Sequence, residues 1–297
     1  MLNKIVIITP AIPRKNIHTE SFKTLHSSLE GYKEKNFKIV HIINIDCPKK
    51  ILDLGYNLEE TIDNFNRIIP EDIEKVYLHG FEPNFSNAYK RIWLEAEKYM
   101  NDRSVILFFE DDWKIVNDFN YIKILSLIDN NFLLTSHHFI NNAPHVMSNK
   151  LYNLYNKYLK STNISKIDPD YIRGNFYKYF LRKKKILCNL KRVFLKEDEI
   201  KKKEYYYKKT FKRKRIKKIE DLKFFRFNMR YYDLLLKEDE LKVLNESNVN
   251  NCEIEKYDIE FDLLTPVRNI SYDIGRKWRD NINLKKWDKD NNKFKTY

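Results

Sequence analysis

Glycine is scarce in this sequence, with only five among 297 residues. Neither GxGxxG nor GxxxxGKS/T occurs, and these glycine-rich loops are the common backbone cradles for phosphate groups. Their absence argues against a dinucleotide-binding or P-loop protein. A metal ion on carboxylates is the remaining standard way to hold a diphosphate, because magnesium and manganese prefer hard oxygen ligands.

Cysteines and long apolar runs are scarce as well. Cys47, Cys188 and Cys252 are far apart and form no CxxC pair, so neither a disulfide framework nor a zinc knuckle is supported and a reducing compartment fits. No stretch reaches the roughly 18 apolar residues that span a bilayer, and the opening MLNKIVIITP has no cleavage-type tail. We expect a cytoplasmic protein that can lie peripherally on a membrane.

Positive charge is in excess, with a formal net charge of +14. Part of it reflects abundant Lys, which with abundant Asn, Ile and Tyr is typical of an AT-rich genome, so its placement is more informative than its total. Basic runs gather in residues 181–218 and are interrupted by acidic and apolar residues. We therefore expect a core over residues 1–180, an ordered basic insertion over 181–225, and a C-terminal extension over 226–297 that packs on the core.

Apolar runs alternate with amphipathic stretches through the first 135 residues. Strands are predicted over 4–9, 37–45, 75–79, 105–109 and 132–135. Helices are predicted between them, the first with Thr19 as N-cap and Gly31 as its stop, and a later one beginning near Ser86. This alternation predicts an α/β fold, Rossmann-like, with a mainly parallel central sheet and helices on both faces.

Ligands of such sheets bind beyond the carboxyl ends of the strands, and three acids stand at one of these ends. Glu110, Asp111 and Asp112 follow the apolar run 105–109 directly. On an extended backbone Glu110 and Asp112 project to one side, with Cα atoms about 6.6 Å apart, and Asp111 points the other way. A solvated turn is the alternative. The position after a buried strand favours a metal site.

The acid triplet after an apolar strand resembles the DXD motif of GT-A glycosyltransferases, with Glu as its first acid. The resemblance covers about residues 4–160 and implies a GT-A-like fold, a nucleoside diphosphate sugar as donor, and Mn²⁺ or Mg²⁺ as cofactor. It also implies that Asp112 is the principal metal ligand, that Glu110 supports it, and that Asp111 approaches the sugar.

Other segments resemble the same family in the same order. "IITPAIPR" is similar to the first strand and nucleotide loop, which implies that Thr9, Pro10 and Arg14 border the base. "NID" places Asp46 where family members use an acid on the base or ribose. A turn acid before Pro48 is the alternative for Asp46.

The segment "PNFSNAYKR" resembles the part of the family that packs near the nucleotide, which suggests Asn87, Ala88 and Arg91. A helix cap is the alternative for Asn87. Near the C-terminus, "DIGRKW" implies that Arg276 or Lys277 reaches the diphosphate when this segment closes over the donor. A surface ion pair is the alternative there.

The general base is expected in "IDPDYIRGN", which follows "APHVMSNKLY", a stretch similar to the family's passage into the acceptor pocket. Inverting members carry an acid here, which implies Asp170 or Asp168 as catalytic base. The usual Glu-Asp pair is missing, and a helix N-cap is the alternative for either residue. Structural roles are favoured for the remaining candidate ligands, His137, His138, Trp278 and Trp287.

The resemblance implies sugar transfer to a hydroxyl of a glycan, lipid or protein, with inversion as in family-2-like members. The basic insertion suggests an anionic acceptor or a membrane surface. A metal-dependent nucleic-acid-processing or nucleic-acid-binding protein is the alternative, although no recognisable nucleic-acid-binding module is present. A binding protein with an inactive transferase fold is a third possibility.

Overall fold

The computed structural model describes residues 2–80, 84–117, 119–126, 128, 131–136, 143–161, 169, 172–173, 176, 186–193, 259–266, 270–281, 285–288 and 293–296. Strands and helices alternate through its first half. They are β1 (Lys4–Ala11), α1 (Lys15–Ser27), β2 (Lys38–Ile45), α2 (Lys49–Asp53), α3 (Leu58–Ile68), β3 (Glu74–His79), α4 (Phe85–Ala96) and β4 (Ser104–Phe108).

Shorter elements follow β4. They are β5 (Trp113–Ile115), α5 (Tyr121–Leu125), β6 (Phe132–Thr135), β7 (His145–Ser148), α6 (Asn149–Ser161), β8 (Ile186–Val193), β9 (Ile259–Pro266), β10 (Ser271–Asp273), α11 (Arg276–Asn281), β11 (Lys285–Asp288) and β12 (Lys293–Thr296).

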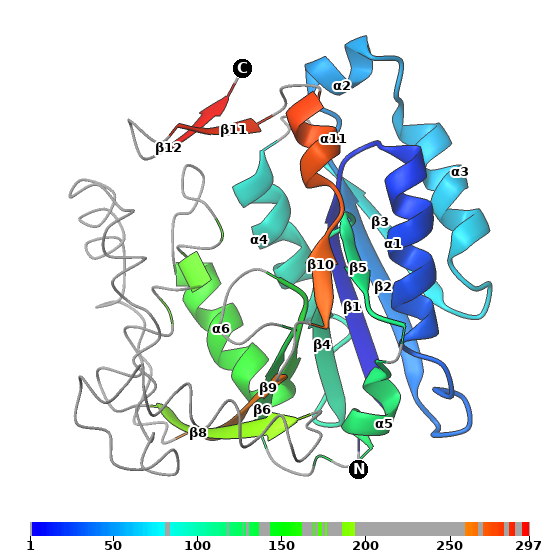
Figure 1. Cartoon of the computed structure of the whole chain (residues 1–297). Helices are drawn as coiled ribbons and strands as arrows, with labels where there is room; N and C mark the ends of the chain where they lie inside the picture. The colour runs from blue at the N-terminus through cyan, green and yellow to red at the C-terminus, as the bar shows by residue number, and fades with distance from the viewer. Residues whose placement is uncertain are drawn as a thin grey trace, which may run out of the picture.

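Eight strands form one sheet in the order β3-β2-β1-β4-β7-β6-β9-β8 (Figure 1). Within the described residues, β7 is antiparallel to its neighbours β4 and β6, and the other pairs are parallel. This arrangement confirms the predicted α/β fold with a mainly parallel sheet. It also brings the carboxyl ends of β1, β2 and β4 to one edge of the molecule.

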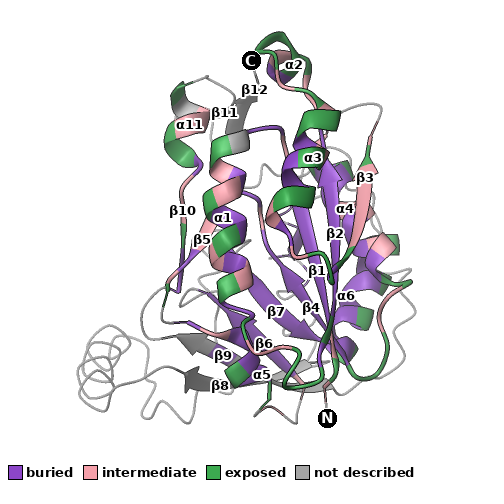
Figure 2. Cartoon of the chain, turned by 90° about the vertical axis from the view of Figure 1, so that its right-hand side faces the viewer, coloured by how far each residue is buried: buried purple, intermediate pink, exposed green. Residues whose placement is uncertain are grey.

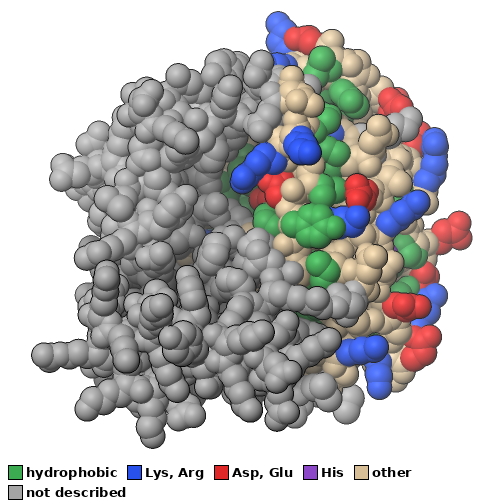
Figure 3. All heavy atoms as spheres, viewed as in Figure 1, with side chains coloured by type: hydrophobic (Ala, Val, Ile, Leu, Met, Phe, Trp, Pro, Cys, Tyr) green, Lys and Arg blue, Asp and Glu red, His purple; other side chains and the backbone are tan. Residues whose placement is uncertain are grey.

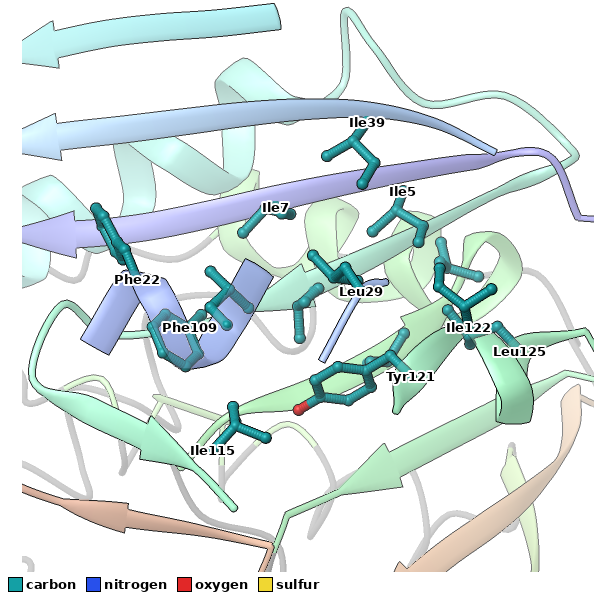
Figure 4. Packing of buried hydrophobic residues seen from close by; sticks show 14 of the residues in the cluster. Ile5, Ile7, Phe22, Leu29, Ile39, Phe109, Ile115, Tyr121, Ile122 and Leu125 are labelled. Carbon is teal, nitrogen blue, oxygen red and sulfur yellow. The ribbon is translucent and has the colours of Figure 1, made fainter. Parts of the chain in front are cut away.

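Two apolar layers cover the sheet, because side chains alternate along each strand. Ile5 and Ile7 of β1 face the layer of α1, α3 and α5, part of which is seen in Figure 4. Val6 and Ile8 face the layer of α4 and α6. Buried residues fill the strands between the two layers, whereas the edge strand β3 is only half-buried (Figure 2). Helices on both faces are thus confirmed.

Asparagine side chains fix the starts of three helices. Asn57, Asn84 and Asn120 each accept a backbone N–H from three residues later, at the N-termini of α3, α4 and α5. The predicted cap of α1 is wrong, because α1 begins at Lys15 and Thr19 lies inside it. Its N-cap is Arg14, whose side chain carries only hydrogen-bond donors and therefore cannot accept a backbone N–H of the first turn.

Strands from the C-terminal part of the chain pair with strands that come earlier in the sequence. β9 lies between β6 and β8, and β10 pairs with β5. Residues 186–193, which the sequence analysis placed in a separate basic insertion, form the edge strand β8. The rest of the expected insertion lies outside the described residues. The described part of the chain has no helix with the length and apolar character needed to cross a bilayer.

Buried histidines make the stability of this fold depend on pH. Both ring nitrogens of His26, on α1, are buried without a hydrogen-bond partner in the described structure. Burial, with the nearby Lys75 charge, lowers the pKa of His26 to about 4. The unfolded chain therefore binds a proton first as the pH falls below about 6.5.

We expect the free energy of unfolding to fall by at most about 3 kcal/mol between pH 6.5 and pH 4 on account of His26. Urea unfolding at several pH values would measure this fall. His26→Leu should flatten the pH dependence. An equal slope for His26→Leu and the unaltered protein would contradict the expectation.

Candidate functional site

The three acids lie in a tight turn after β4. Phe109 N still donates to Ile8 O at 3.0 Å, but Trp113 N then donates back to Glu110 O at 3.2 Å. The backbone is therefore not extended here, and the expected projection of Glu110 and Asp112 to one side is wrong. The Glu110 carboxylate accepts the Trp113 indole N–H at 2.9 Å. Asp111 and Asp112 instead meet the same arginine.

Asp111 is buried, and both of its carboxylate oxygens accept hydrogen bonds. Arg14 donates from Nε at 3.0 Å and from Nη2 at 2.5 Å, and Ile12 N donates at 3.1 Å. His18 Nε2 lies 2.8 Å from Asp111 Oδ2. Burial alone would raise the pKa of Asp111, but Arg14 and His18 outweigh it and lower the pKa to about 2. Asp111 is thus a structural anion beside the first turn of α1.

Arg14 is enclosed between the turn and the C-terminal segment. Its side chain is 6% exposed, and Nη1 donates to Asp112 Oδ2 at 2.9 Å. The Trp278 ring covers it, with the Arg14 Cζ atom 5.3 Å from the ring centroid. Such a guanidinium, forked onto one carboxylate and covered by an indole, is fixed in place. Arg14 therefore positions the two aspartates.

Asp112 meets the C-terminal segment directly. Arg279 Nη1 donates to Asp112 Oδ2, and Ile274 N donates to Asp112 O at 2.8 Å. A Cβ atom on Gly275 would lie only 2.7 Å from Asp112 Cγ, so only glycine allows this close approach. The segment reaches this place because β10 pairs with β5, with Asp273 opposite Trp113.

Asp273 organises the start of α11. Its Oδ1 accepts Gly275 N and Arg276 N, both at 2.9 Å, and its Oδ2 accepts Arg279 Nη2 at 2.6 Å. Burial raises the pKa of Asp273 despite these partners. Arg276, which the sequence suggested for the diphosphate, has a side chain that is 79% exposed and lies 3.8 Å from Asp273. Lys277 is also exposed.

Arg279, Asp273 and His18 belong to the cluster but were not among the residues predicted from the sequence. A signal was present, because Arg279 follows Gly275 by four residues and therefore lies on the same face of a helix. The close backbone approach at Gly275 is what brings this face to the acids. Trp278, whose packing was expected, contacts Arg14 and, with a ring separation of 6.4 Å, Tyr56.

A second polar cluster lies at the end of β2. Asp46 Oδ1 accepts Asn44 Nδ2 at 2.9 Å, and Asp46 Oδ2 accepts Asn84 N at 3.1 Å. Arg91 Nη1 donates to Asn44 Oδ1 at 2.5 Å, and its guanidinium lies where a Cβ on Gly80 would be. Burial raises the pKa of Asp46. Asp46 thus ties β2 to the start of α4.

The remaining residues that were predicted to border the nucleotide lie in β1 and α4. Thr9 is buried and its hydroxyl lies 2.9 Å from His41 Nε2, and Pro10 is buried beside it in β1. Asn87 is exposed on α4, where its N–H is capped by Asn84, and Ala88 lies in the core. Asp168, Asp170, His137 and His138 lie outside the described residues, and Trp287 lies in β11.

Asp112 is the candidate ligand for a divalent metal. Within the described residues, no three His, Cys, Asp or Glu side chains converge to hold a metal ion. Three carboxylates, Asp111, Asp112 and Asp273, face the guanidinium groups of Arg14 and Arg279, with His18 on Asp111 and Arg276 at 3.8 Å from Asp273. Mg²⁺ needs only one or two protein carboxylates when a substrate supplies phosphate oxygens. A hard dication at Asp112 therefore needs phosphate oxygens from a substrate and the departure of a guanidinium from Asp112 Oδ2.

Comparisons with known proteins give weak likenesses. No protein-family model and no curated protein matches the sequence. Among solved structures, S. aureus TarS is 12% identical over 44% of this chain and 21% of that chain, with a TM-score of 0.30. Its residues 1–349 alone match at 12% identity over 44% of this chain and 34% of that chain, with a TM-score of 0.31.

A third structure is the mannosyltransferase PcManGT from Pyrobaculum calidifontis in complex with GDP-Man and Mn²⁺. It is 8% identical over 59% of this chain and 52% of that chain, with a TM-score of 0.40. The chain thus matches between 21% and 52% of the length of these proteins. Likenesses of this size assign neither a fold nor an activity to the chain.

Replacing Asp111 tests its structural role. Asp111→Asn should reduce the free energy of unfolding by about 3–5 kcal/mol, because it leaves the buried Arg14 with a weaker counter-charge. Urea unfolding at pH 7 measures the loss. Asp53→Asn, at an exposed acid on α2, should change stability by less than about 0.5 kcal/mol. Equal stability of the two variants would show that Asp111 does not hold the site together.

Proposed function

We propose that this protein is a glycosyltransferase that moves a sugar from a nucleoside diphosphate sugar to a hydroxyl group. One observation carries the proposal: an aspartate pair stands at the carboxyl end of β4 in a mainly parallel sheet, where its outer member, Asp112, meets a guanidinium from the C-terminal segment. The resemblance of residues 110–112 to the DXD motif supports the same activity. This edge is where ligands of such sheets bind.

The donor would lie across the carboxyl ends of β2, β1 and β4. The polar cluster of Asn44, Asp46 and Arg91 stands at the β2 end, where a base or ribose needs hydrogen-bonding groups. Arg279 is the guanidinium suited to an anionic diphosphate, because its side chain is 28% exposed while Arg14 is buried beneath Trp278. Charge on the leaving diphosphate would thus develop near Arg279.

Asp112, supported by Glu110, would hold Mn²⁺ or Mg²⁺. When bound, the ion supplies Lewis-acid charge for the departing diphosphate. Asp111 does not approach the sugar in this proposal, since its carboxylate is occupied by Arg14 and His18. Its part is to fix Arg14, and through Arg14 the orientation of Asp112.

The acceptor hydroxyl needs a base if the reaction inverts configuration. We keep Asp170, with Asp168 as its substitute, as the candidate base, on the strength of the family resemblance of their segment. General-base loss typically lowers rates by roughly a hundredfold or more. Transfer at the full rate by both Asp170→Asn and Asp168→Asn would place the base elsewhere or indicate a retaining reaction.

The acceptor is proposed to be an anionic glycan, lipid or protein, or one presented on a membrane surface. The basic residues of 181–218 motivate this proposal, and β8 places the start of that segment at the sheet edge beside β9. A nucleic acid is not favoured. On the described part of the face in Figure 3, Lys and Arg side chains are interspersed with Asp and Glu and form no continuous basic surface.

Donor hydrolysis with a panel of nucleotide sugars and Mn²⁺ tests the proposed function. We expect hydrolysis of at least one donor. Asp112→Asn should lower the rate of hydrolysis by roughly a hundredfold, because the negative carboxylate charge that would bind the dication is lost. Asp63→Asn, at an exposed acid on α3, should be as active as the unaltered protein. No turnover of any donor, or full activity of a folded Asp112→Asn variant, would refute the proposal.

A further inference from the structure

Two leucine side chains are exposed at the end of the molecule that carries α2 and α11 (Figure 1). Leu52 and Leu54 are each 49% exposed, more than any other large apolar side chain in the described part of the chain. Single exposed apolar side chains are ordinary, but neighbouring ones indicate contact with a second surface. We refer to α2, residues 54–56 and α11 as the α2–α11 tip.

Backbone hydrogen bonds fix the turn that carries these leucines. Gly55 N donates to Leu52 O at 2.9 Å, and Tyr56 N donates to Ile51 O at 3.3 Å. This pair of bonds typically ends a helix at a residue with positive φ, and Gly55 has a φ of +83°. Ile51 is fully buried and anchors α2 to the core. The leucines on either side of Asp53 are therefore held in solvent by a defined turn and have no part in the core.

Basic side chains lie on both helices of the α2–α11 tip. Lys49 is exposed at the start of α2, and Arg276 and Lys277 are exposed on α11. The rings of Tyr56 and Trp278 are 6.4 Å apart, which places α11 beside the turn after α2. Figure 3 shows Lys and Arg side chains beside apolar ones at this end of the molecule. The exposed apolar pair thus has cationic neighbours.

Acids are present near the tip as well. Asp53 is exposed on α2, and Glu59 and Glu60 are exposed at the start of α3, beyond the turn. The basic residues therefore bias the tip toward an anionic surface without making it strongly cationic. Most of the binding free energy would have to come from burial of the two leucines.

The size of the apolar pair favours a lipid surface over a protein partner. Two half-exposed leucines offer far less area than the roughly 1,000 Å² that a stable protein interface buries. A bilayer needs no matching shape, because each apolar group that enters the headgroup region and each basic group near anionic lipid adds to the binding. α11 also carries Arg279 of the candidate site, so a surface under the tip would lie beside that site.

We propose that the α2–α11 tip docks on an anionic lipid surface, with Leu52 and Leu54 in the headgroup region and Lys49, Arg276 and Lys277 facing lipid phosphates. The inference rests on the proposed function for its membrane-presented acceptor, and it gives that acceptor a docking surface. Vesicle binding needs neither the donor nor sugar transfer, so it is measured apart from the proposed activity.

Sedimentation with vesicles at low salt tests the docking. The protein should bind vesicles that contain phosphatidylglycerol more tightly than vesicles of phosphatidylcholine alone. The double variant Leu52→Ser/Leu54→Ser should bind the mixed vesicles roughly tenfold or more weakly, because its apolar contact is lost. Lys49→Gln should weaken binding by about fivefold. Tyr272→Ser removes an exposed apolar side chain from β10 and should change binding by less than about twofold.

Circular dichroism must show each variant folded. If the double variant does not fold, Leu54→Ser alone should weaken binding by roughly fivefold. Unchanged binding by a folded leucine variant would overturn the proposal, and so would failure of the unaltered protein to bind mixed vesicles. A dimer in size-exclusion chromatography that depends on the leucines would assign the tip to a second copy and also overturn it.

The donor-hydrolysis assay separates this inference from the proposed function. Hydrolysis by the unaltered protein together with leucine-independent vesicle binding would refute the docking surface alone. Leucine-dependent vesicle binding without turnover of any donor would refute the proposed function and leave the docking surface in place.

Discussion

Two adjacent aspartates cannot be buried at the end of a strand without counter-charges, because an unpaired buried carboxylate is strongly unfavourable. In this protein Asp111 and Asp112 draw those charges from segments far apart in the sequence. Arg14 comes from the junction of β1 and α1, and Arg279 comes from α11. The whole edge of the sheet is organised by this requirement.

The need of these aspartates for counter-charges explains several local features. α1 follows Arg14, a residue with no acceptor to cap the helix, and Asp111 instead provides negative charge beside the first turn. Gly275 is required where the C-terminal segment passes over Asp112. β10 joins β5 at the same turn, so the last part of the chain completes a site that the first 112 residues begin.

Much of the fold could be predicted from the sequence because its strands are continuous apolar runs. β1, β2, β3, β4 and β6 were all expected to within two residues. Long-range pairing could not be predicted in this way. β8 lies in the segment that composition marks as basic, β9 lies in the expected C-terminal extension, and β5 and β10 are three residues each, too short to show a period of two.

The site was predictable where it depended on strand order and not where it depended on side-chain partners. Asp112 and Arg14 were expected at the ligand edge, and the structure brings them together. The alternation expected for residues 110–112 was wrong, since a turn replaces the extended backbone. Arg279 was missed because its role arises from the approach of a segment more than 160 positions away, and the spacing of Gly275 and Arg279 does not by itself show which residues that segment meets.

The central claim is that ligands meet Arg279 and Asp112 while Arg14 and Asp111 stay fixed behind them. The most direct measurement is the ¹⁵Nε–Hε spectrum of the arginine side chains, assigned with Arg279→Lys and Arg14→Lys, during titration with a nucleoside diphosphate and Mg²⁺. The account predicts that the Arg279 signal moves with saturation while the Arg14 signal stays in place. A saturating titration that leaves Arg279 unmoved, or that moves Arg14 instead, would contradict it.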